Sequence, residues 1–172
     1  METVFTAADI QAAVARLARE IERDYRDKNP ILLGVLKGCF VFMADLVRAL
    51  NMPVEIEFIS LSSYGPRRTQ STGRIEVVQG LRKPVRARHV LVVEDIIDTG
   101  VTLDFTLHYL RRRRPASVRV CALFDKTSRR KVPVSADYVG LTVPDCFLVG
   151  YGLDFDERFR HLPGLYCLKE DD

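Results

Sequence analysis

One segment in the middle of the chain limits the possible folds more than any other. Residues 92–102 read V-V-E-D-I-I-D-T-G-V-T and continue a short apolar run that begins at residue 89. An apolar run of this length is typical of a buried parallel strand, and residues 101–114 have the pattern of a helix. Acids, a glycine and threonines therefore lie between a strand end and a helix start, where open α/β sheets bind their ligands.

The rest of the chain alternates between helical and strand patterns. Thr6 is suited to cap a first helix, with Asp9 completing a capping box. The order of elements predicts an α/β fold with a largely parallel, twisted sheet flanked by helices. The chain has 172 residues, of which 47% are hydrophobic, and we expect residues 1–172 to form a single domain with one sizeable core. We expect a second helix at 39–50 and further strands at 31–36, 54–59, 74–78, 118–124, 138–141, 147–151 and 165–168.

Composition removes several classes of protein. The net charge of +3 permits an anionic ligand but does not argue for nucleic acid. No apolar run approaches the roughly 18 residues of a membrane helix, and the start lacks a signal-peptide pattern, so we expect a cytoplasmic protein without membrane partners. The cysteines lack zinc-site spacing, and we expect no structural disulfide in a reducing compartment. They are Cys39, Cys121, Cys146 and Cys167.

The segment from Asp98 to Thr102 is suited to bind a phosphate. A helix start offers unpaired backbone N–H groups and the positive end of the helix dipole. Gly100 permits close approach of the backbone, and the hydroxyls of Thr99 and Thr102 add donors. Helix capping by Thr99 or Asp98 is the simpler alternative.

Glu94 and Asp95 come directly before this loop. Adjacent carboxylates can accept hydrogen bonds from a vicinal diol or approach a divalent cation, although two solvated loop acids are the simpler interpretation. One segment could thus hold a phosphate, a diol and a metal, which describes a ribose 5-phosphate. The predicted binding residues are Glu94, Asp95, Ile96, Ile97, Asp98, Thr99, Gly100, Val101 and Thr102.

The same letters also match the Asp-Thr-Gly signature of aspartic proteases. That chemistry needs two aspartates that share a proton, on a strand-rich fold. This chain has one Asp-Thr-Gly, at Asp98, and helical sequence follows it. The alternation of helices and strands therefore argues against a protease.

Residues 92–102 resemble the phosphoribosyl-diphosphate signature of type I phosphoribosyltransferases, in the form found in the hypoxanthine/guanine branch. The resemblance extends from about Pro30 onward, through Leu36-Lys37-Gly38, Ser63-Tyr64, Lys126 and residues 145–160. It implies a type I fold with a small hood and a mobile lid loop. It also implies that a 6-oxopurine displaces diphosphate from 5-phosphoribosyl 1-diphosphate with Mg²⁺, giving IMP or GMP, in a homodimer or homotetramer.

The resemblance implies roles for individual residues. Asp98 would be the general base, and Lys126 would donate to the exocyclic oxygen of the purine. Phe147 would stack on the base, although an aromatic residue in an apolar run is more often core. The backbone of Leu148 would bind the edge of the base. Asp154, which belongs to the same base-binding segment, would ligate a second Mg²⁺, while Glu94 and Asp95 would lie near the first.

The remaining implied roles concern diphosphate and the lid. Lys37 and Gly38 would bind diphosphate in a loop with a cis peptide bond after Leu36, although a Lys-Gly turn is also a plain strand ending. Arg160 would donate charge-assisted hydrogen bonds to the same group. Ser63 and Tyr64 would belong to a lid in the polar stretch 62–73, which is too polar to pack.

Two alternative functions are compatible with the same fold. An RNA-binding regulator or uracil-type enzyme would use the basic runs 111–114 and 129–131, although the first is more simply a solvated helix end. An inactive binding domain would not need Asp98, Lys37 and Arg160. The purine-type residues favour the enzyme, without a nucleic-acid partner.

Overall fold

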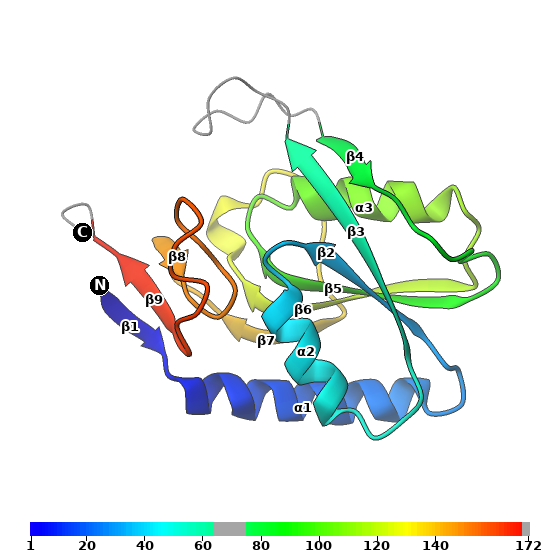
Figure 1. Cartoon of the computed structure of the whole chain (residues 1–172), viewed down its shortest axis with the longest axis horizontal. Helices are drawn as coiled ribbons and strands as arrows, with labels where there is room; N and C mark the ends of the chain where they lie inside the picture. Colours follow the sequence, from blue (N-terminus) through cyan, green and yellow to red (C-terminus); the bar gives the residue numbers. More distant parts are fainter. Residues whose placement is uncertain (64–74, 170–172) are drawn as a thin grey trace.

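The computed structural model describes residues 1–63 and 75–169, and these form two sheets (Figure 1). The central sheet has the strand order β4-β3-β2-β5-β6-β7, and a smaller sheet, which we call the hood, has the order β1-β9-β8. The elements are β1 (Glu2–Phe5), α1 (Ala7–Tyr25), β2 (Ile31–Leu36), α2 (Phe40–Ala49), β3 (Glu55–Ser63), β4 (Ile75–Gln79), β5 (His89–Ile97), α3 (Val101–Arg111), β6 (Ser117–Asp125), a 3-10 turn (Thr127–Arg129), β7 (Tyr138–Thr142), β8 (Phe147–Val149) and β9 (Leu165–Leu168).

The central sheet is largely parallel, as the sequence predicts. The pairs β3–β2, β2–β5, β5–β6 and β6–β7 are all parallel, and only β4 runs antiparallel, on the edge beside β3. The register places Ile97 of β5 opposite Asp125 of β6. The residues that follow these strands therefore emerge at one edge of the sheet, where a ligand site is expected.

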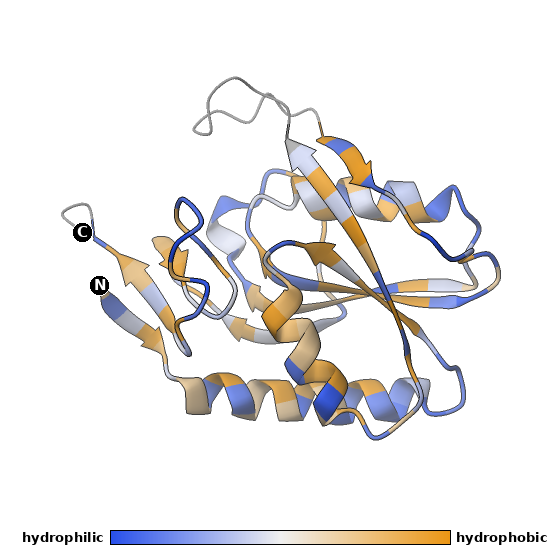
Figure 2. Cartoon of the chain, viewed as in Figure 1, coloured by the Kyte–Doolittle hydropathy of each residue, from blue (hydrophilic) through white to orange (hydrophobic). Residues whose placement is uncertain are grey.

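Each face of the central sheet has its own apolar core. Leu91 and Val93 of β5 belong to the core that α1 and α2 cover, whereas Val90 and Val92 belong to the core beneath α3. This alternation follows from the two-residue period of a strand, and it explains why β5 is apolar on both faces. Figure 2 shows how the helices differ from such central strands: β2 is hydrophobic along its length, whereas hydrophobic and hydrophilic residues alternate on α1.

The N-terminal segment contains a helix that the sequence predicts and a strand that it does not. Thr6 caps α1, and Thr6 and Asp9 form the predicted capping box. β1 precedes this helix and pairs antiparallel with β9, so the two ends of the described chain lie side by side in the hood (Figure 1). A four-residue strand whose partner lies about 160 residues away carries little local signal.

Several boundaries differ from the expectation. β5 continues through Ile97, so the acids of the candidate site lie on a strand and not in a loop. β3 extends to Ser63, which pairs with Ile75 of β4, and α3 ends at Arg111. Ser63 is thus the last strand residue before the proposed lid, while Tyr64 and residues 65–74 lie outside the described residues.

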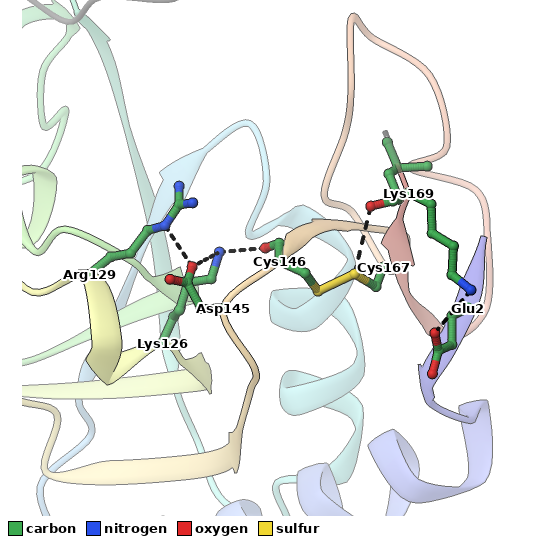
Figure 3. The surroundings of a disulfide bond; sticks show 8 residues. Glu2, Lys126, Arg129, Asp145, Cys146, Cys167 and Lys169 are labelled. Carbon is green, nitrogen blue, oxygen red and sulfur yellow. Dashed lines mark hydrogen bonds and ion pairs between the residues drawn. A yellow bond between two sulfur atoms is a disulfide. The ribbon is translucent and has the colours of Figure 1, made fainter. Parts of the chain in front are cut away.

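The expectation of unpaired cysteines is wrong for one pair. Cys146 and Cys167 form a disulfide, with their Cα atoms 5.9 Å apart (Figure 3). The cause is the antiparallel pairing of β8 with β9, which sets Leu148 opposite Cys167 and brings Cys146 beside it. Cys39 and Cys121 are free and buried, as expected for cysteines in apolar runs.

The candidate basic patch 111–114 is an exposed helix end. All four arginines are exposed, and Arg113 donates to the carbonyl of Tyr109, 2.7 Å away, near the end of α3. Among residues 1–63 and 75–169, no helix combines the length and hydrophobicity that crossing a membrane requires.

We expect Leu17→Ala to destabilise the protein by roughly 2.5–5 kcal/mol, because Leu17 is fully buried in the core between α1 and the sheet. Arg19→Ala, at an exposed position of the same helix, should change stability by less than about 0.5 kcal/mol. Denaturant unfolding of both variants measures the difference. Equal losses would show that this face of α1 does not anchor the core.

Candidate active site

A cavity of about 550 Å³ opens at the carboxyl edge of the central sheet. It is lined by the ends of β2 and β5, by residues 94–103, by Lys37 and Gly38, and by Lys131. The structure thus gathers the whole predicted sugar-phosphate segment and the predicted diphosphate loop around one space. Lys126, Phe147, Leu148, Asp154 and Arg160 are not among its lining residues and belong to adjoining segments.

The turn into α3 depends on Gly100. Its φ of +82° is left-handed, and a Cβ there would lie 2.6 Å from a methyl carbon of Val134. Both facts require glycine at this position. The backbone N–H of Val101 donates to the hydroxyl of Thr99 at 3.4 Å, but Gly100 is the N-cap residue of α3 and no side chain caps this helix, so the simpler role of Thr99 as a helix cap is not found. The N–H groups of the first turn of α3 face this turn, as a phosphate cradle requires.

Glu94 and Asp95 are not solvated loop acids. Their exposed fractions are 5% and 8%, because both lie on β5 inside the molecule. Burial raises the pKa of Glu94 well above its ordinary range, and the neighbouring charge of Asp95 adds to the effect. Burial also raises the pKa of Asp95 to about 6. Two desolvated acids in sequence favour a ligand that brings positive charge or hydroxyl donors.

Three buried polar atoms in this region have no hydrogen-bond partner among the described residues: Oε1 of Glu94, Oδ1 of Asp98 and Nε of Arg160. An unpaired buried polar atom costs about 1–3 kcal/mol, so such atoms are rare away from functional sites. The carboxylate oxygens suit Mg²⁺, which prefers oxygen ligands. Within the described part of the chain no three acids, cysteines or histidines form a metal cage.

The loop after β2 packs directly against the acid pair. A Cβ on Gly38 would lie 1.7 Å from Oδ2 of Asp95, so only glycine fits there. The carbonyl of Gly38 in turn lies against Gly152, where a Cβ would come within 2.4 Å of it. The peptide bond between Leu36 and Lys37 is cis, as the resemblance implies. Gly38 therefore links the acid pair to the segment that carries Asp154.

Lys126 lies at the junction of the sheet and the predicted base-binding segment. Its backbone N–H donates to the carbonyl of Ile97 at 3.0 Å, one residue before Asp98. Its side chain is 4% exposed, and Nζ donates to the carbonyl of Cys146 at 2.6 Å (Figure 3). Asp145 lies 3.8 Å from the same nitrogen. The ammonium group is thus fixed beside the residue that precedes Phe147.

Phe147 is not a core residue. Its side chain is 51% exposed and meets Phe155 edge to face, with ring centroids 5.3 Å apart. Leu148, by contrast, is buried in β8. An exposed ring held by a second ring leaves a face on which a planar ligand can stack.

The segment 154–160 forms a small charged cluster. Arg160 lies 2.8 Å from Asp154 and donates to the carbonyl of Gly152 at 2.7 Å. Glu157 lies 3.0 Å from Nζ of Lys37 and 3.4 Å from Arg160. Glu157 is a residue that the sequence analysis missed. The sequence shows that Glu157 lies three residues before Arg160, which could have suggested an ion pair between them. The contact of Glu157 with Lys37 depends on the fold and has no local sequence pattern.

Arg130 and Lys131 are the other residues missed as parts of the site. Arg130 donates to the carbonyl of Asp98 at 3.2 Å and forms a partly buried ion pair with Asp125. The backbone N–H of Lys131 donates to the carbonyl of Thr99 at 2.9 Å. Arg130 and Lys131 therefore brace the turn that is predicted to bind phosphate, whereas Arg129 pairs with Asp145. These contacts do not support the run as an RNA-binding patch.

The fold and this site together define a class of protein. A parallel sheet whose central strand ends in buried acids and a phosphate-type turn, beside a hood, is the architecture of type I phosphoribosyltransferases, as the sequence predicts. A family model described as "Phosphoribosyl transferase domain" matches residues 2–156.

Individual relatives agree with that match. The chain is 44% identical to the hypoxanthine-guanine phosphoribosyltransferase of Dictyostelium discoideum, over 99% of this chain and 96% of the relative. It is 41% identical to the enzyme of that name from Bacillus subtilis, over 98% and 93%. The solved hypoxanthine phosphoribosyltransferase of Trypanosoma cruzi with its product IMP has a TM-score of 0.92 at 40% identity, over 99% and 95%. The chain belongs to the phosphoribosyltransferase family, in the branch of these purine enzymes.

We expect Asp95→Asn to stabilise the protein in the absence of substrate at pH 7.5. The pKa of Asp95 rises from 3.8 to about 6 on folding. The ionised carboxylate therefore destabilises the folded state above pH 6, and this penalty fades as the pH falls toward 3.8. The gain should be on the order of 1–3 kcal/mol at pH 7.5 and should vanish near pH 4.

Thermal unfolding across this pH range measures the effect. Asp27→Asn, an exposed position after α1, makes the same charge change and should leave stability nearly unaltered. If Asp95→Asn were less stable than the unaltered chain at pH 7.5, the ionised Asp95 carboxylate would not be destabilising the folded protein.

Proposed function

We propose that this chain transfers the 5-phosphoribosyl group of 5-phosphoribosyl 1-diphosphate to hypoxanthine and guanine, giving IMP and GMP. The observation that carries the proposal is Asp98, which lines the cavity beside the phosphate-type turn and the buried acids and whose Oδ1 is buried without a hydrogen-bond partner among the described residues. The names of the relatives, and the IMP bound to the Trypanosoma cruzi enzyme, support the purine assignment.

The sugar phosphate would bind along residues 94–102. The first turn of α3 and the hydroxyls of Thr99 and Thr102 would donate to the 5-phosphate. Glu94 and Asp95 would accept hydrogen bonds from the ribose hydroxyls. The backbone around the ligand would be shaped by the remaining residues of the segment, which are Ile96, Ile97, Gly100 and Val101. Bracing by Arg130 and Lys131 keeps this turn in place before the substrate arrives.

Two groups of carboxylates would hold Mg²⁺. Glu94 and Asp95 lie on the sugar side, and Asp154 lies beside Arg160 on the diphosphate side. Mg²⁺ bound there would neutralise the diphosphate and so make it a better leaving group. The buried negative charge of the acid pair also stabilises positive charge that develops at the sugar carbon as its bond to diphosphate breaks.

The base would bind between Lys126 and Phe147. Lys126 would donate to the oxygen at C6, which adenine lacks, while Phe147 would stack on the ring and the backbone of Leu148 would bind its edge. Asp98 would accept the proton from the ring nitrogen as that nitrogen attacks the sugar carbon. Its Oδ1, which has no hydrogen-bond partner among the described residues, would be free to act as that acceptor.

Lys37, the backbone of Gly38 and Arg160 would bind the diphosphate. Ser63, at the end of β3, and Tyr64 would belong to a lid that excludes water from the cationic sugar.

We further propose that residues 1–172 form one domain that assembles as a homodimer or homotetramer. Because its phosphorylated substrates do not cross membranes, we place it in the cytoplasm, without nucleic-acid or membrane partners.

Purified protein should form nucleotide from hypoxanthine and guanine in the presence of Mg²⁺ and 5-phosphoribosyl 1-diphosphate. Adenine should react hardly at all, because Lys126 would face its amino group instead of an oxygen. An absorbance assay with hypoxanthine, guanine, xanthine and adenine, with and without Mg²⁺, measures this. Absence of product from both hypoxanthine and guanine would overturn the proposed reaction.

Asp98→Asn should lower kcat by roughly 10²–10⁴-fold, because an amide cannot accept the proton of the base. Binding of 5-phosphoribosyl 1-diphosphate, followed by calorimetry, should survive because the backbone of the turn is unchanged. Asp27→Asn provides a control with the same change of charge far from the site. Unaltered turnover in Asp98→Asn would remove Asp98 as the base.

A further inference from the structure

The two cations that the proposed function assigns to diphosphate share one acid. Glu157 accepts a hydrogen bond from Nζ of Lys37 at 3.0 Å, and its other carboxylate oxygen lies 3.4 Å from Arg160. Lys37 and Glu157 are 120 residues apart in the chain, so this contact arises from the fold and not from local sequence. A carboxylate that bridges a lysine and an arginine makes the same kind of charge-assisted bonds as a phosphate oxygen.

A tight turn holds Glu157 in this position. The backbone N–H of Glu157 donates to Oδ2 of Asp154 at 2.8 Å. Phe155 and Arg158 exchange backbone hydrogen bonds of 3.2 and 3.0 Å across the turn. Glu157 itself has a φ of +63°, a conformation that side-chain-bearing residues seldom adopt. The backbone therefore aims this carboxylate at Lys37 and Arg160.

The two cations differ in how firmly they are held. Arg160 keeps its bonds to Asp154 and to the carbonyl of Gly152, and its side chain is only 19% exposed. Lys37 is 67% exposed, and among the described residues Glu157 is its ion-pair partner.

Resting on the proposed function, we infer that Glu157 is a positioning residue that competes with diphosphate for Lys37 and Arg160. A diphosphate that binds both cations must displace the carboxylate from them. The carboxylate returns when diphosphate leaves, which accelerates release of this product. Glu157 thereby sets the affinity of the subsite without contacting the reacting atoms.

A purely structural role predicts the opposite result. If Glu157 only orients Lys37 and Arg160 for the ligand, its neutralisation should disorder them and weaken diphosphate binding. If it competes with the ligand, its neutralisation should strengthen binding. The sign of the change therefore separates the two roles.

The test is calorimetric binding of inorganic diphosphate with Mg²⁺ to the full chain, its Glu157→Gln variant and the Asp27→Asn control. We expect Glu157→Gln to bind about two- to fivefold more tightly, a modest gain because the ion pair with Lys37 is exposed. Release of diphosphate, followed by stopped flow, should slow by a similar factor. The affinity of Asp27→Asn should match that of the unaltered chain.

A second comparison assigns the effect to Lys37. In a Lys37→Met background, Glu157→Gln should change diphosphate affinity by much less, because the principal contact is already gone. Glu157→Ala repeats the test with a different side chain if the glutamine variant unfolds. Weaker or unchanged binding in both Glu157 variants would overturn the inference, even with normal IMP formation. An unaltered chain that neither binds diphosphate nor forms IMP would overturn the proposed function as well.

Discussion

The desolvated acid pair at the end of β5 is the constraint around which this molecule is built. Glu94 and Asp95 lie in a strand that is apolar on both faces, and burial raises the pKa of both carboxyls. Such charges destabilise the fold unless a ligand compensates them. The loop after β2 has to pass so close to Asp95 that Gly38 has no room for a side chain. Pairing with β2 on one side and β6 on the other fixes β5, and with it both acids, inside the sheet.

The phosphate-type turn depends on β6 and the segment after it. Lys126 bonds to the carbonyl of Ile97, Arg130 to that of Asp98 and Lys131 to that of Thr99. Three consecutive carbonyls are thus tied to one neighbouring segment, which also supplies the lysine proposed to select the base. Preorganised sites gain their precision from such supporting contacts. A change in the 126–131 segment should therefore affect both the proposed phosphate subsite and the proposed base subsite.

Much of the fold and the core of the candidate site could be predicted because their signals are local. Apolar runs, a capping box at Thr6 and the acid-rich strand end identify the elements and their order. The apolar run 89–93 does not reveal where β5 ends, because acids are depleted in strands and only the pairing with β6 carries the strand on through Ile97. β1, the disulfide of Cys146 and the contact between Lys37 and Glu157 join segments far apart in sequence. No local pattern carries that information.

The two ends of the candidate site are electrostatically unlike, and the difference has a physical reason. On the sugar side, the acids are buried with unpartnered oxygens, so a ligand with hydroxyls or a cation relieves a cost that already exists. On the side proposed for diphosphate, Asp154 and Glu157 already pair with Arg160, although its Nε is unpartnered, so an anion there would largely replace existing ion pairs. We therefore expect the proposed diphosphate subsite to gain less from its ligand than the proposed sugar subsite does. That order suits a transferase, whose leaving group must depart from the subsite on every turnover.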